Sequence, residues 1–297
     1  MAIFLIAGGS GMIGKSLSQK LNASDHEVRI LSRKGISDVA AGTFQWDPAK
    51  DWVDEKAFEG VDYVINLAGA GIASKRWSSS RKKVIIDSRV RSTLLLKKYL
   101  QKEKKVRAYL GASAIGFYGN RPGELLSEES LPGKGFLSET CQLWESAHNQ
   151  IAGLGIRTVI LRIGIVLDAD GGAFPKMVMP FKLGLGNTFG SGKQIYSWIH
   201  VQDVCGLFQM LALNENAKGI YNLVSPNPKT QKAFAESIRK NLFPKSLIVP
   251  VPEIALQVGL GEMKNTVMDS AEVSAGKVLG LGYSFIFPEL AGALVNL

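Results

Sequence analysis

The sequence predicts an α/β fold in which a doubly wound parallel sheet is joined to a smaller C-terminal lobe. The first observation is the alternation of strand-like and helix-like segments in the first half of the chain, which is typical of a parallel sheet covered by helices on both faces. The second is a glycine-rich turn directly after the first strand. Strands are expected at about 2–7, 27–31, 43–46, 61–67, 106–112 and 156–165, and helices at about 12–23, 78–101 and 138–153.

The glycine-rich turn leaves the start of the following helix free of bulky side chains. Gly8 permits the tight turn, Gly11 lets the backbone approach a phosphate, and Gly14 lets the helix pack close to the strand. Exposed amides and the helix dipole attract negative charge there. This arrangement is typical of the Rossmann dinucleotide-binding fold. We expect these residues of the turn to contact the cofactor: Gly8, Ser10, Gly11, Met12, Ile13 and Gly14.

An alternative interpretation uses the same segment. Residues 9–16 also fit the pattern G-x-x-x-x-G-K-S, the phosphate-binding loop of nucleoside triphosphatases. Such an enzyme also needs a strand that ends in a magnesium-binding Asp, and the only passable candidate is Asp168, far along the chain. The dinucleotide interpretation is therefore preferred, and it leaves Lys15 and Ser16 on the surface of the first helix.

The end of the second strand predicts which dinucleotide is bound. A dinucleotide site needs a group for the adenosine ribose about 20 residues after the glycine turn, and Ser32, Arg33 and Lys34 occupy that place. An acidic residue would bind a free 2′-hydroxyl and repel a 2′-phosphate. A hydroxyl followed by two cations favours the phosphate, because arginine can donate two hydrogen bonds to it at once. The sequence therefore predicts NADP(H) as the cofactor.

The composition argues against several other classes of protein. Cys141 and Cys205 form neither a disulfide framework nor a C-x-x-C motif, which favours a reducing, cytoplasmic compartment. The histidines are scattered without ligand spacing, so no metal site is predicted. The apolar N-terminus enters the glycine turn at once, which indicates a strand and not a signal peptide. No apolar stretch approaches the roughly 18 residues of a membrane span, so no membrane association is expected.

The net charge of +9 is concentrated in residues 81–107, which hold 11 basic and two acidic residues. Within this run Ile86, Val90 and Leu94 mark a helix with one buried face. Two hypotheses remain for its charges: a solvated helix surface, or an anion-facing strip for a polyanionic partner. Nucleic-acid binding is not expected, because no nucleic-acid motif or interleaved aromatic residue accompanies the charges. Arg89 is the exception and is expected to point back towards the cofactor.

The composition changes after about residue 165, where glycine- and proline-rich loops replace the regular alternation. We expect an NADP-binding Rossmann domain over 1–165 that also uses 196–224. The remainder, 166–297, is expected to form a substrate-covering lobe over the carboxyl edge of the sheet, where cofactor and substrate would meet.

Two elements of the second half are predicted in more detail. A helix is expected at about 230–242, with Thr230 as its cap. Residues 199–203 are expected to pass from a strand into a helix. There Asp203 is predicted to be a helix cap and not a catalyst, and His200 a packed structural histidine.

Several further motifs lie along the chain: A-G-G-S-G-M-I-G at 7–14, L-S-R at 31–33, W-D at 46–47, N-L-A-G at 66–69, S-A-I-G-F-Y-G at 113–119, W-E at 144–145, L-R at 161–162, G-L-G at 184–186, S-W-I-H-V-Q-D at 197–203 and V-P-V-P at 249–252. Together they resemble the extended and atypical short-chain dehydrogenase/reductase superfamily, over essentially the whole chain. More narrowly they resemble its branch of nucleoside-diphosphate-sugar epimerase-like proteins, some of which are linked to cell division. The resemblance implies a Rossmann fold and an NADP site that also includes Trp46, Asn66, Leu67, Ala68 and Gly69.

The chemistry of that superfamily depends on a Tyr-x-x-x-Lys pair after the fifth strand and on a Ser or Thr at that strand's end. The tyrosine transfers the proton as hydride moves to or from the nicotinamide, and the lysine lowers the pKa of the phenol. No tyrosine of this chain has a lysine four residues later, and the two positions fall near Leu137 and Cys141. Cys141 shares a helical face with apolar residues, so it is expected to be a buried residue and not a nucleophile.

Two residues are predicted to take part in catalysis. Ser113 matches the superfamily's hydroxyl by position and could polarise a carbonyl, where the alternative is a hydroxyl that only closes a strand end. Tyr118 lies in the turn after that strand and is the nearest remaining phenol, so it is the candidate proton donor.

The second half is poor in arginine, the residue that usually clamps a substrate diphosphate. Only Arg239 follows Arg162, and Lys176, Lys182 and Lys193 flank the glycine-rich loop as a weaker clamp. The sequence therefore predicts an NADP(H)-binding oxidoreductase or epimerase-like protein, a monomer or homodimer, for a small carbonyl or alcohol that includes sugar derivatives. The alternative is a non-catalytic NADP(H) sensor or interaction protein that kept the fold and lost the acid.

Overall fold

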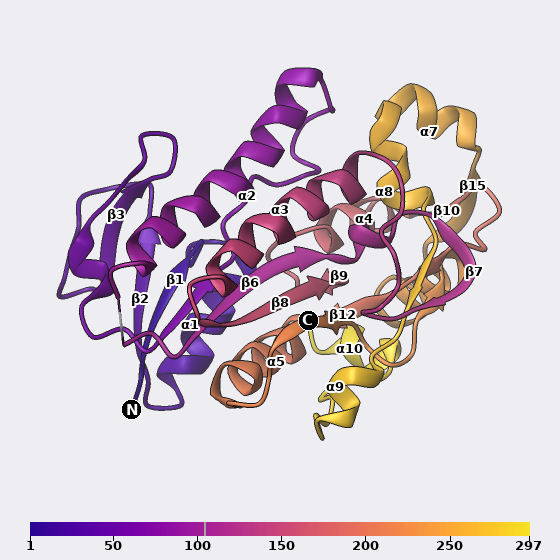
Figure 1. Ribbon diagram of the computed structural model, residues 1–297. Helices are drawn as coiled ribbons and strands as arrows, with labels where there is room; N and C mark the ends of the chain where they lie inside the picture. The colour runs from indigo at the N-terminus through magenta and orange to yellow at the C-terminus, as the bar shows by residue number, and fades with distance from the viewer. Residues whose placement is uncertain (104) are drawn as a thin grey trace.

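A sheet of eight strands forms the centre of the computed structural model, which describes residues 1–103 and 105–297 (Figure 1). The chain builds outward from the first strand in one direction and then returns to its other side, so the strand order reverses between β1 and β5. All neighbours are parallel except β3 and β4. The doubly wound topology is therefore confirmed. The order across the sheet is β13 (Gly219–Leu223), β8 (Arg157–Ile163), β6 (Ala108–Ala114), β5 (Tyr63–Asn66), β1 (Ile3–Ala7), β2 (Glu27–Ser32), β3 (Thr43–Asp47) and β4 (Trp52–Val53).

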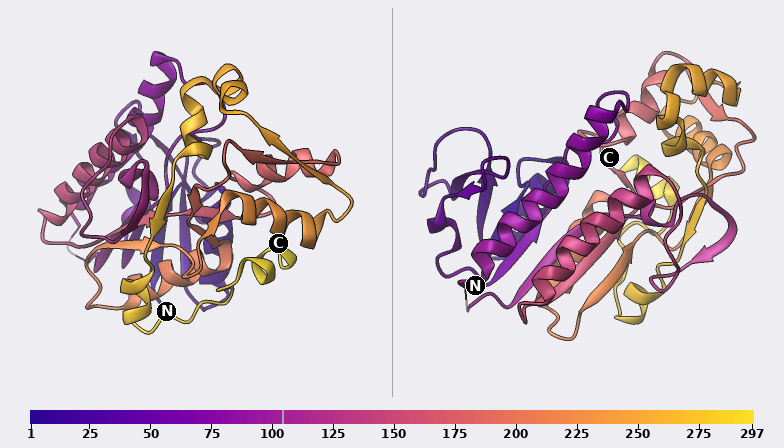
Figure 2. Two further views of the ribbon diagram at one scale, coloured as in Figure 1. Left: turned by 90° about the vertical axis from the view of Figure 1, so that its right-hand side faces the viewer. Right: turned by 45° about the horizontal axis from the view of Figure 1, so that its top comes forward.

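Helices cover both faces of this sheet, as Figure 2 shows. Helices α2 (Ser79–Leu100) and α3 (Phe136–Ala152) lie side by side on one face, and α1 (Met12–Asn22) packs beside α5 (Val201–Leu213) on the other. The alternation of side chains along β1 supports both layers, because successive residues of a strand point to opposite faces. Phe4 and Ile6 pack with the α1 side, whereas Leu5 and Ala7 pack with the α2 side.

The long basic helix α2 buries a different face from the one predicted. The expected stripe of Ile86, Val90 and Leu94 is wrong, since Leu94 is 37% exposed and the other two are only partly buried. The buried face carries Ile85 and, further along, Ser92. Small polar residues occur on this face, so a search for apolar residues alone misplaces it. Lys104, which belongs to the basic run, lies outside the described residues.

The rest of the chain adds short elements around the sheet. The 3-10 turns are η1 (Glu55–Phe58), η2 (Ile115–Tyr118) and η3 (Gly261–Lys264), and the short strands are β7 (Arg121–Leu126), β9 (Ile165–Leu167), β10 (Leu185–Phe189), β11 (Ile195–Tyr196), β12 (Trp198–His200), β14 (Lys229–Thr230), β15 (Leu247–Val251) and β16 (Ala271–Val273). The helices are α4 (Phe174–Lys182), α6 (Gln231–Leu242), α7 (Glu253–Leu260), α8 (Asn265–Met268), α9 (Gly276–Gly280) and α10 (Leu290–Val295). The helix expected near 230–242 is confirmed as α6, and Thr230 caps it by accepting a hydrogen bond from the Ala233 amide at 3.1 Å.

The passage from β12 into α5 corrects one prediction. His200 is the cap of α5, because its Nδ1 accepts a hydrogen bond from the Gln202 amide at 3.2 Å, and its ring is buried as expected. Asp203 lies inside the helix and is not its cap. Its buried carboxylate accepts hydrogen bonds from the amides of Ile286 at 2.7 Å and Phe287 at 3.0 Å. Asp203 therefore ties the C-terminal segment to the sheet's helical layer.

Within the described residues, no helix combines the length and the apolar character needed to cross a membrane.

Candidate functional site

The carboxyl ends of β1 and β5 meet where the strand order reverses. Gly8 follows β1 with φ at +84°, a conformation that favours glycine. A Cβ atom at Gly8 would lie 2.9 Å from the Ala68 amide nitrogen and 2.9 Å from the Leu67 carbonyl carbon. The backbones of the two strand ends are therefore in contact. In open parallel sheets, this switch point is where a crevice receives the ligand.

The start of α1 lies at this switch point, where the fold predicts the ligand crevice. Gly11 is the cap residue, no side chain caps the helix, and its first turn holds no acidic residue. Ser10 and Gly11 are exposed. A Cβ at Gly14 would lie 2.5 Å from the Gly8 carbonyl oxygen and 2.6 Å from the Gly9 Cα, so the predicted close packing at Gly14 is confirmed. The first-turn amides of α1 therefore form a bare, positively polarised surface for an anion.

Two cations stand at the end of β2, beside the crevice. The Ser32 hydroxyl forms hydrogen bonds within its own turn. Its Oγ donates to the Lys34 carbonyl at 3.0 Å and accepts from the Lys34 amide at 3.1 Å. Arg33 and Lys34 are exposed, and neither side chain has an ion pair or hydrogen bond within the described residues. Their charges are free to meet an anionic group.

The side chains of Trp46 and Asn66 lie inside the protein, contrary to the prediction that they contact a cofactor. Trp46 is 3% exposed and packs with Phe44 in the apolar cluster of the α2 face. Asn66 is fully buried, and its Nδ2 donates to Thr93 Oγ1 at 3.0 Å and to Tyr109 Oη at 3.1 Å. Asn66 Oδ1 accepts the Ala68 amide at 3.1 Å, so this residue shapes the loop after β5 without being exposed to the crevice.

Arg89 points from α2 towards that loop. Its Nη1 donates to the carbonyls of Ala70 at 3.1 Å and Ile85 at 2.9 Å. The guanidinium packs against the exposed Gly69 and lies 5.0 Å above the ring of Trp144. Burial lowers the pKa of Arg89. Arg89 is thus a cation held at the end of β5.

Ser113 ends β6 within a buried polar network. Its Oγ donates to Glu145 Oε1 at 2.6 Å. The same carboxylate accepts two hydrogen bonds from Arg162, Nε to Oε1 at 2.9 Å and Nη2 to Oε2 at 2.9 Å, in a bidentate ion pair. Sheet register places Ser113 directly beside Arg162. Because a serine has only one proton to donate, Ser113 keeps only acceptor capacity for a further partner.

Tyr118 is not placed as a proton donor to a ligand. It is fully buried, donates to Asn222 Oδ1 at 2.7 Å and accepts from Arg162 Nη1 at 3.0 Å. Burial raises its pKa, although the hydrogen bond from Arg162 opposes this. The prediction for Tyr118 is therefore corrected: the turn after β6 carries its ring into the core.

The sequence predicted the superfamily's tyrosine and lysine positions near Leu137 and Cys141, and both of these residues lie on α3. Cys141 is buried, as predicted, and its Sγ lies 3.7 Å from the Ala114 carbonyl oxygen. Burial raises the pKa of its thiol to about 11, and the charge of Glu145 adds to this. The thiol is therefore protonated at neutral pH and unsuited to act as a nucleophile.

Segments of the C-terminal lobe cover the crevice. A Cβ at Gly172 would lie 2.8 Å from the Sδ of Met12, which places this loop on the start of α1. Lys176 Nζ donates to the Ala73 carbonyl, and Arg76 Nη2 donates to the Val258 carbonyl at 3.4 Å. The lobe thus covers the carboxyl edge of the sheet at both the glycine turn and the loop after β5.

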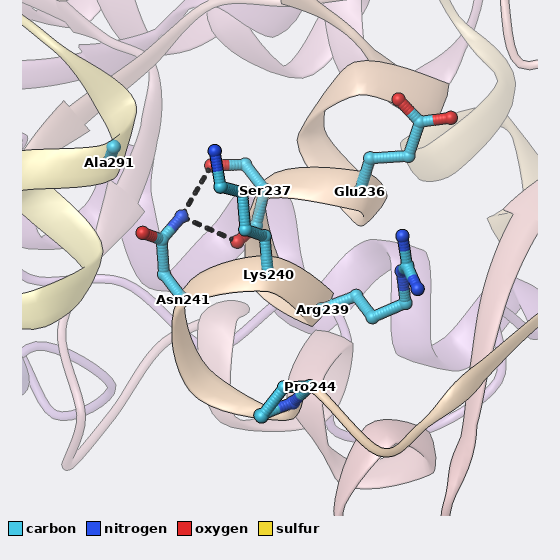
Figure 3. A pocket seen from close by; sticks show the side chains of 7 residues that line it. All are labelled: Glu236, Ser237, Arg239, Lys240, Asn241, Pro244 and Ala291. Carbon is cyan, nitrogen blue, oxygen red and sulfur yellow. Dashed lines mark hydrogen bonds between the residues drawn. The ribbon is translucent and has the colours of Figure 1, made fainter.

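The other candidate clamp residues lie elsewhere. Lys182 and Lys193 are exposed and have no side-chain contact with the crevice within the described residues. Arg239 lines a separate hollow of about 520 Å³ on α6, together with Lys240 and Asn241, as Figure 3 shows. A second hollow, of about 600 Å³, lies at the opposite edge of the sheet, beside the starts of β8 and β13. No group of three potential metal ligands occurs in the part of the chain that the structure describes.

The sequence interpretation missed the supporting residues of the site. Glu145 and Arg162 position Ser113, and the available signal was a charged residue within the apolar run 157–163. Arg81 was also missed: it lies on the same side of α2 as Arg89 and its Nη2 donates to Ser74 Oγ at 2.7 Å. The available signal was the eight-residue interval between the two arginines, which places both on one side of a helix.

Comparison with known proteins agrees with this arrangement. Residues 4–223 match the NAD dependent epimerase/dehydratase family, and residues 251–297 match a domain of unknown function, DUF1731. An epimerase family protein of Staphylococcus aureus (strain NCTC 8325 / PS 47) is 35% identical, over 100% of this chain and 99% of the relative. The human epimerase family protein SDR39U1 (isoform 2), crystallised with NADPH, superimposes with a TM-score of 0.89 at 31% identity and covers 99% of this chain and 98% of its own.

A nucleoside-diphosphate sugar epimerase from Corynebacterium glutamicum superimposes with a TM-score of 0.81 at 26% identity. The match covers 99% of this chain and 57% of that larger one. The segment that matches the family extends from the first strand to β13 and includes every site residue predicted from the sequence. The chain therefore belongs to the NAD-dependent epimerase/dehydratase family, in the epimerase-like branch of the extended short-chain dehydrogenases/reductases.

Proposed function

We propose that this protein is an NADP(H)-dependent oxidoreductase or epimerase-like enzyme that acts on a small carbonyl or alcohol, sugar derivatives included. The observation that carries the proposal is the uncapped start of α1 at the switch point, next to Arg33 and Lys34 with no counter-charge among the described residues. That combination suits a pyrophosphate and a third phosphate on the adenosine ribose. The NADPH in the crystal structure of human SDR39U1 supports this choice of cofactor.

The residues fit the cofactor in a definite order along the carboxyl edge. The pyrophosphate would lie on residues 8–14, and the 2′-phosphate would lie against Ser32, Arg33 and Lys34. The nicotinamide half would then extend over residues 67–69, towards Ser113. When bound, the cofactor supplies or accepts the hydride.

The Ser113–Glu145 pair is the proposed route for the proton. Ser113 Oγ donates to Glu145 and can accept a hydrogen bond from a substrate hydroxyl. As the substrate's C–H hydride departs, its O–H proton passes to Ser113 Oγ while the serine proton passes to Glu145. Carbonyl reduction runs the same transfers in reverse. The ion pair with Arg162 holds Glu145 in place on the side away from the substrate.

A second candidate function is a non-catalytic NADP(H) sensor or interaction protein on the same fold. The observation that favours it is that no tyrosine of the chain has a lysine four residues later, while Cys141, near the expected lysine position, is buried. Such a protein would bind the cofactor and respond to it without turnover.

The two functions are separated by measuring binding and turnover on the same protein. Calorimetry with NADPH, NADH and ATP–Mg²⁺ tests the cofactor, and absorbance at the reduced-nicotinamide band tests turnover against a panel of sugar nucleotides and carbonyl compounds. We expect NADPH binding and a turnover that Ser113→Ala and Glu145→Gln reduce by about 100-fold or more, whereas Ser146→Ala, an exposed neighbour on α3, leaves it unchanged. Tight NADPH binding without turnover on any compound would favour the sensor. Binding of ATP–Mg²⁺ in place of NADPH would overturn both.

A further inference from the structure

We propose that Arg89 binds the nicotinamide-side ribose of NADP(H) and is the fixed cation of the hydride-transfer site, in the place left without a lysine on α3. This inference rests on the proposed function, since it requires that NADP(H) is the ligand. It assigns to Arg89 of α2 the cationic role for which α3 has no lysine at the expected position.

The position of Arg89 along the sheet identifies the half of the cofactor that it meets. The 2′-phosphate cations end β2, and the pyrophosphate surface lies where β1 and β5 meet. The rest of the dinucleotide must therefore extend away from β2, over the ends of β5 and β6. Arg89 contacts Gly69 and Ala70, the residues after β5, and so lies on this second half.

The donors of Arg89 are divided between the protein and the crevice. Nη1 is used by the carbonyls of Ala70 and Ile85, which fix the guanidinium above the Trp144 ring. Nε and Nη2 donate to no described residue, and neither is among the buried polar atoms that lack a partner, so both are reached from outside the protein. Two free donors on a rigid fork match the adjacent hydroxyls of a ribose.

The charge of Arg89 also lacks a carboxylate. No ion pair of Arg89 occurs within the described residues, although burial lowers its pKa. A partly desolvated cation without a counter-ion is unfavourable unless its hydrogen bonds are satisfied. A ligand with polar oxygens would satisfy them, and this explains why the guanidinium is held at the crevice by carbonyls alone.

Arg89 also lies against α3, because its guanidinium is 5.0 Å from the ring of Trp144, three residues after Cys141. Burial raises the pKa of the Cys141 thiol, and among the opposing effects is the charge of Arg89. Arg89 thus brings a positive charge from α2 to the part of α3 where the superfamily's lysine is expected. The Cys141 Sγ lies 3.7 Å from the carbonyl oxygen of Ala114, the residue after Ser113, so the cation and the proposed proton route share one neighbourhood.

The test compares ligands that contain successive parts of the cofactor. Calorimetry is done with NADPH, with 2′-phospho-ADP-ribose, which lacks the nicotinamide, and with 2′-phospho-ADP, which ends at the pyrophosphate. For Arg89→Met we expect the affinity for NADPH and 2′-phospho-ADP-ribose to fall about tenfold or more, and the affinity for 2′-phospho-ADP to change by less than about twofold. Arg89→Lys should show the same pattern with a smaller loss, because lysine has no planar fork.

Two further variants separate ligand binding from loop structure. Arg91→Met removes a cation on the outer side of α2, where it pairs with Asp87, and should leave all three affinities unchanged. Ser88→Ala removes the 2.9 Å hydrogen bond to the Ala70 amide and loosens the same loop while Arg89 stays. It should not reproduce the ligand-selective loss. Thermal unfolding without ligand checks that each variant is folded, and if Arg89→Met does not fold, Arg89→Lys carries the test.

The outcomes distinguish this inference from the proposed function. An equal loss for 2′-phospho-ADP would place Arg89 on the pyrophosphate and overturn the inference, as would no loss for any ligand. Wild-type protein that binds neither NADPH nor 2′-phospho-ADP would instead overturn the proposed function.

Discussion

Arg33 and Lys34 carry the expected preference for NADP(H) over NAD(H), because both are exposed cations that no described carboxylate neutralises. Arg33→Glu would remove the charge-assisted hydrogen bond that we propose to the 2′-phosphate, and it would introduce repulsion. We expect it to weaken NADPH binding by about 2 kcal/mol or more and to affect NADH much less. Titration calorimetry measures both affinities. Lys245→Glu, an exposed cation far along the chain, is the control for net charge, and a wild type that binds NADH as tightly as NADPH would contradict the assignment.

His148 gives the protein a pH-dependent stability. The ring is fully buried between the Tyr109 hydroxyl at 2.8 Å and the Ala112 carbonyl at 3.0 Å. Because a carbonyl can only accept, Nε2 carries the proton and Nδ1 accepts from Tyr109. Burial lowers the pKa of His148 to about 4, although the Ala112 hydrogen bond opposes this. The folded protein therefore keeps the His148 ring in its neutral form.

The sign of the effect follows from that pKa. Between about pH 6.5 and pH 4 the unfolded chain binds a proton at this residue and the folded protein does not, so the free energy of unfolding falls as the pH falls, by up to about 3 kcal/mol. Above pH 6.5 the contribution is constant. Urea unfolding at pH 7, 5.5 and 4.5 should show a shallower decline for His148→Gln than for wild type or for His26→Gln. Parallel declines in all three proteins would contradict this role of His148 in the pH dependence of stability.

The packing of α1 on the end of β1 depends on the close approach of Gly14 to the backbone of Gly8 and Gly9. Ala at position 14 would press its Cβ against the backbone of Gly8 and Gly9, atoms that cannot move aside like a side chain. We expect Gly14→Ala to lower the free energy of unfolding by about 1–3 kcal/mol and to weaken NADPH binding. Gly292→Ala in α10, where a Cβ has open space, should raise stability by roughly 0.5–1 kcal/mol. Urea midpoints measure both, and a neutral Gly14→Ala would show that the helix can shift.

Helix α2 shows how an element combines two surfaces. Its outer face carries Lys83 and Arg91, both paired with Asp87, which is the behaviour of a solvated basic surface. Its inner face carries Arg89 and Ser88, which hold the loop after β5. The described part of the basic run is therefore divided by helix geometry, and within it only the cations on the inner face reach the loop after β5.

At the scale of the whole molecule, Asp203 connects the C-terminal segment to the sheet. Asp203→Ala would leave the amides of Ile286 and Phe287 without their carboxylate acceptor. We expect a loss of about 2–4 kcal/mol in the free energy of unfolding, with faster proteolytic release of the C-terminal segment in the native protein. Limited trypsin digestion followed by mass spectrometry measures the release. Asp170→Ala, at an exposed loop position, is the control, and equal cleavage rates would contradict this role.

The alternation of strands and helices, the glycine turn and the cap at Thr230 were all predicted from the sequence, because each depends on residues within one or two turns of each other. Strand period, a glycine without a Cβ and a side-chain cap act locally, so the sequence carries their signals directly. The same local logic placed the cations at the end of β2. Local patterns thus determined the sheet, its direction and the edge where a ligand would lie.

The tertiary structure alone decided which of the predicted residues reach that edge. The rings of Tyr118 and Trp46 lie in the core, Asp203 bonds to a segment some 80 residues away, and Arg89 lies against Trp144 of α3. These outcomes depend on burial and on partners distant in sequence, where a polar group takes whichever acceptor the packed fold offers it. Local spacing cannot contain that information, because the free energy of such contacts exists only after the elements have packed.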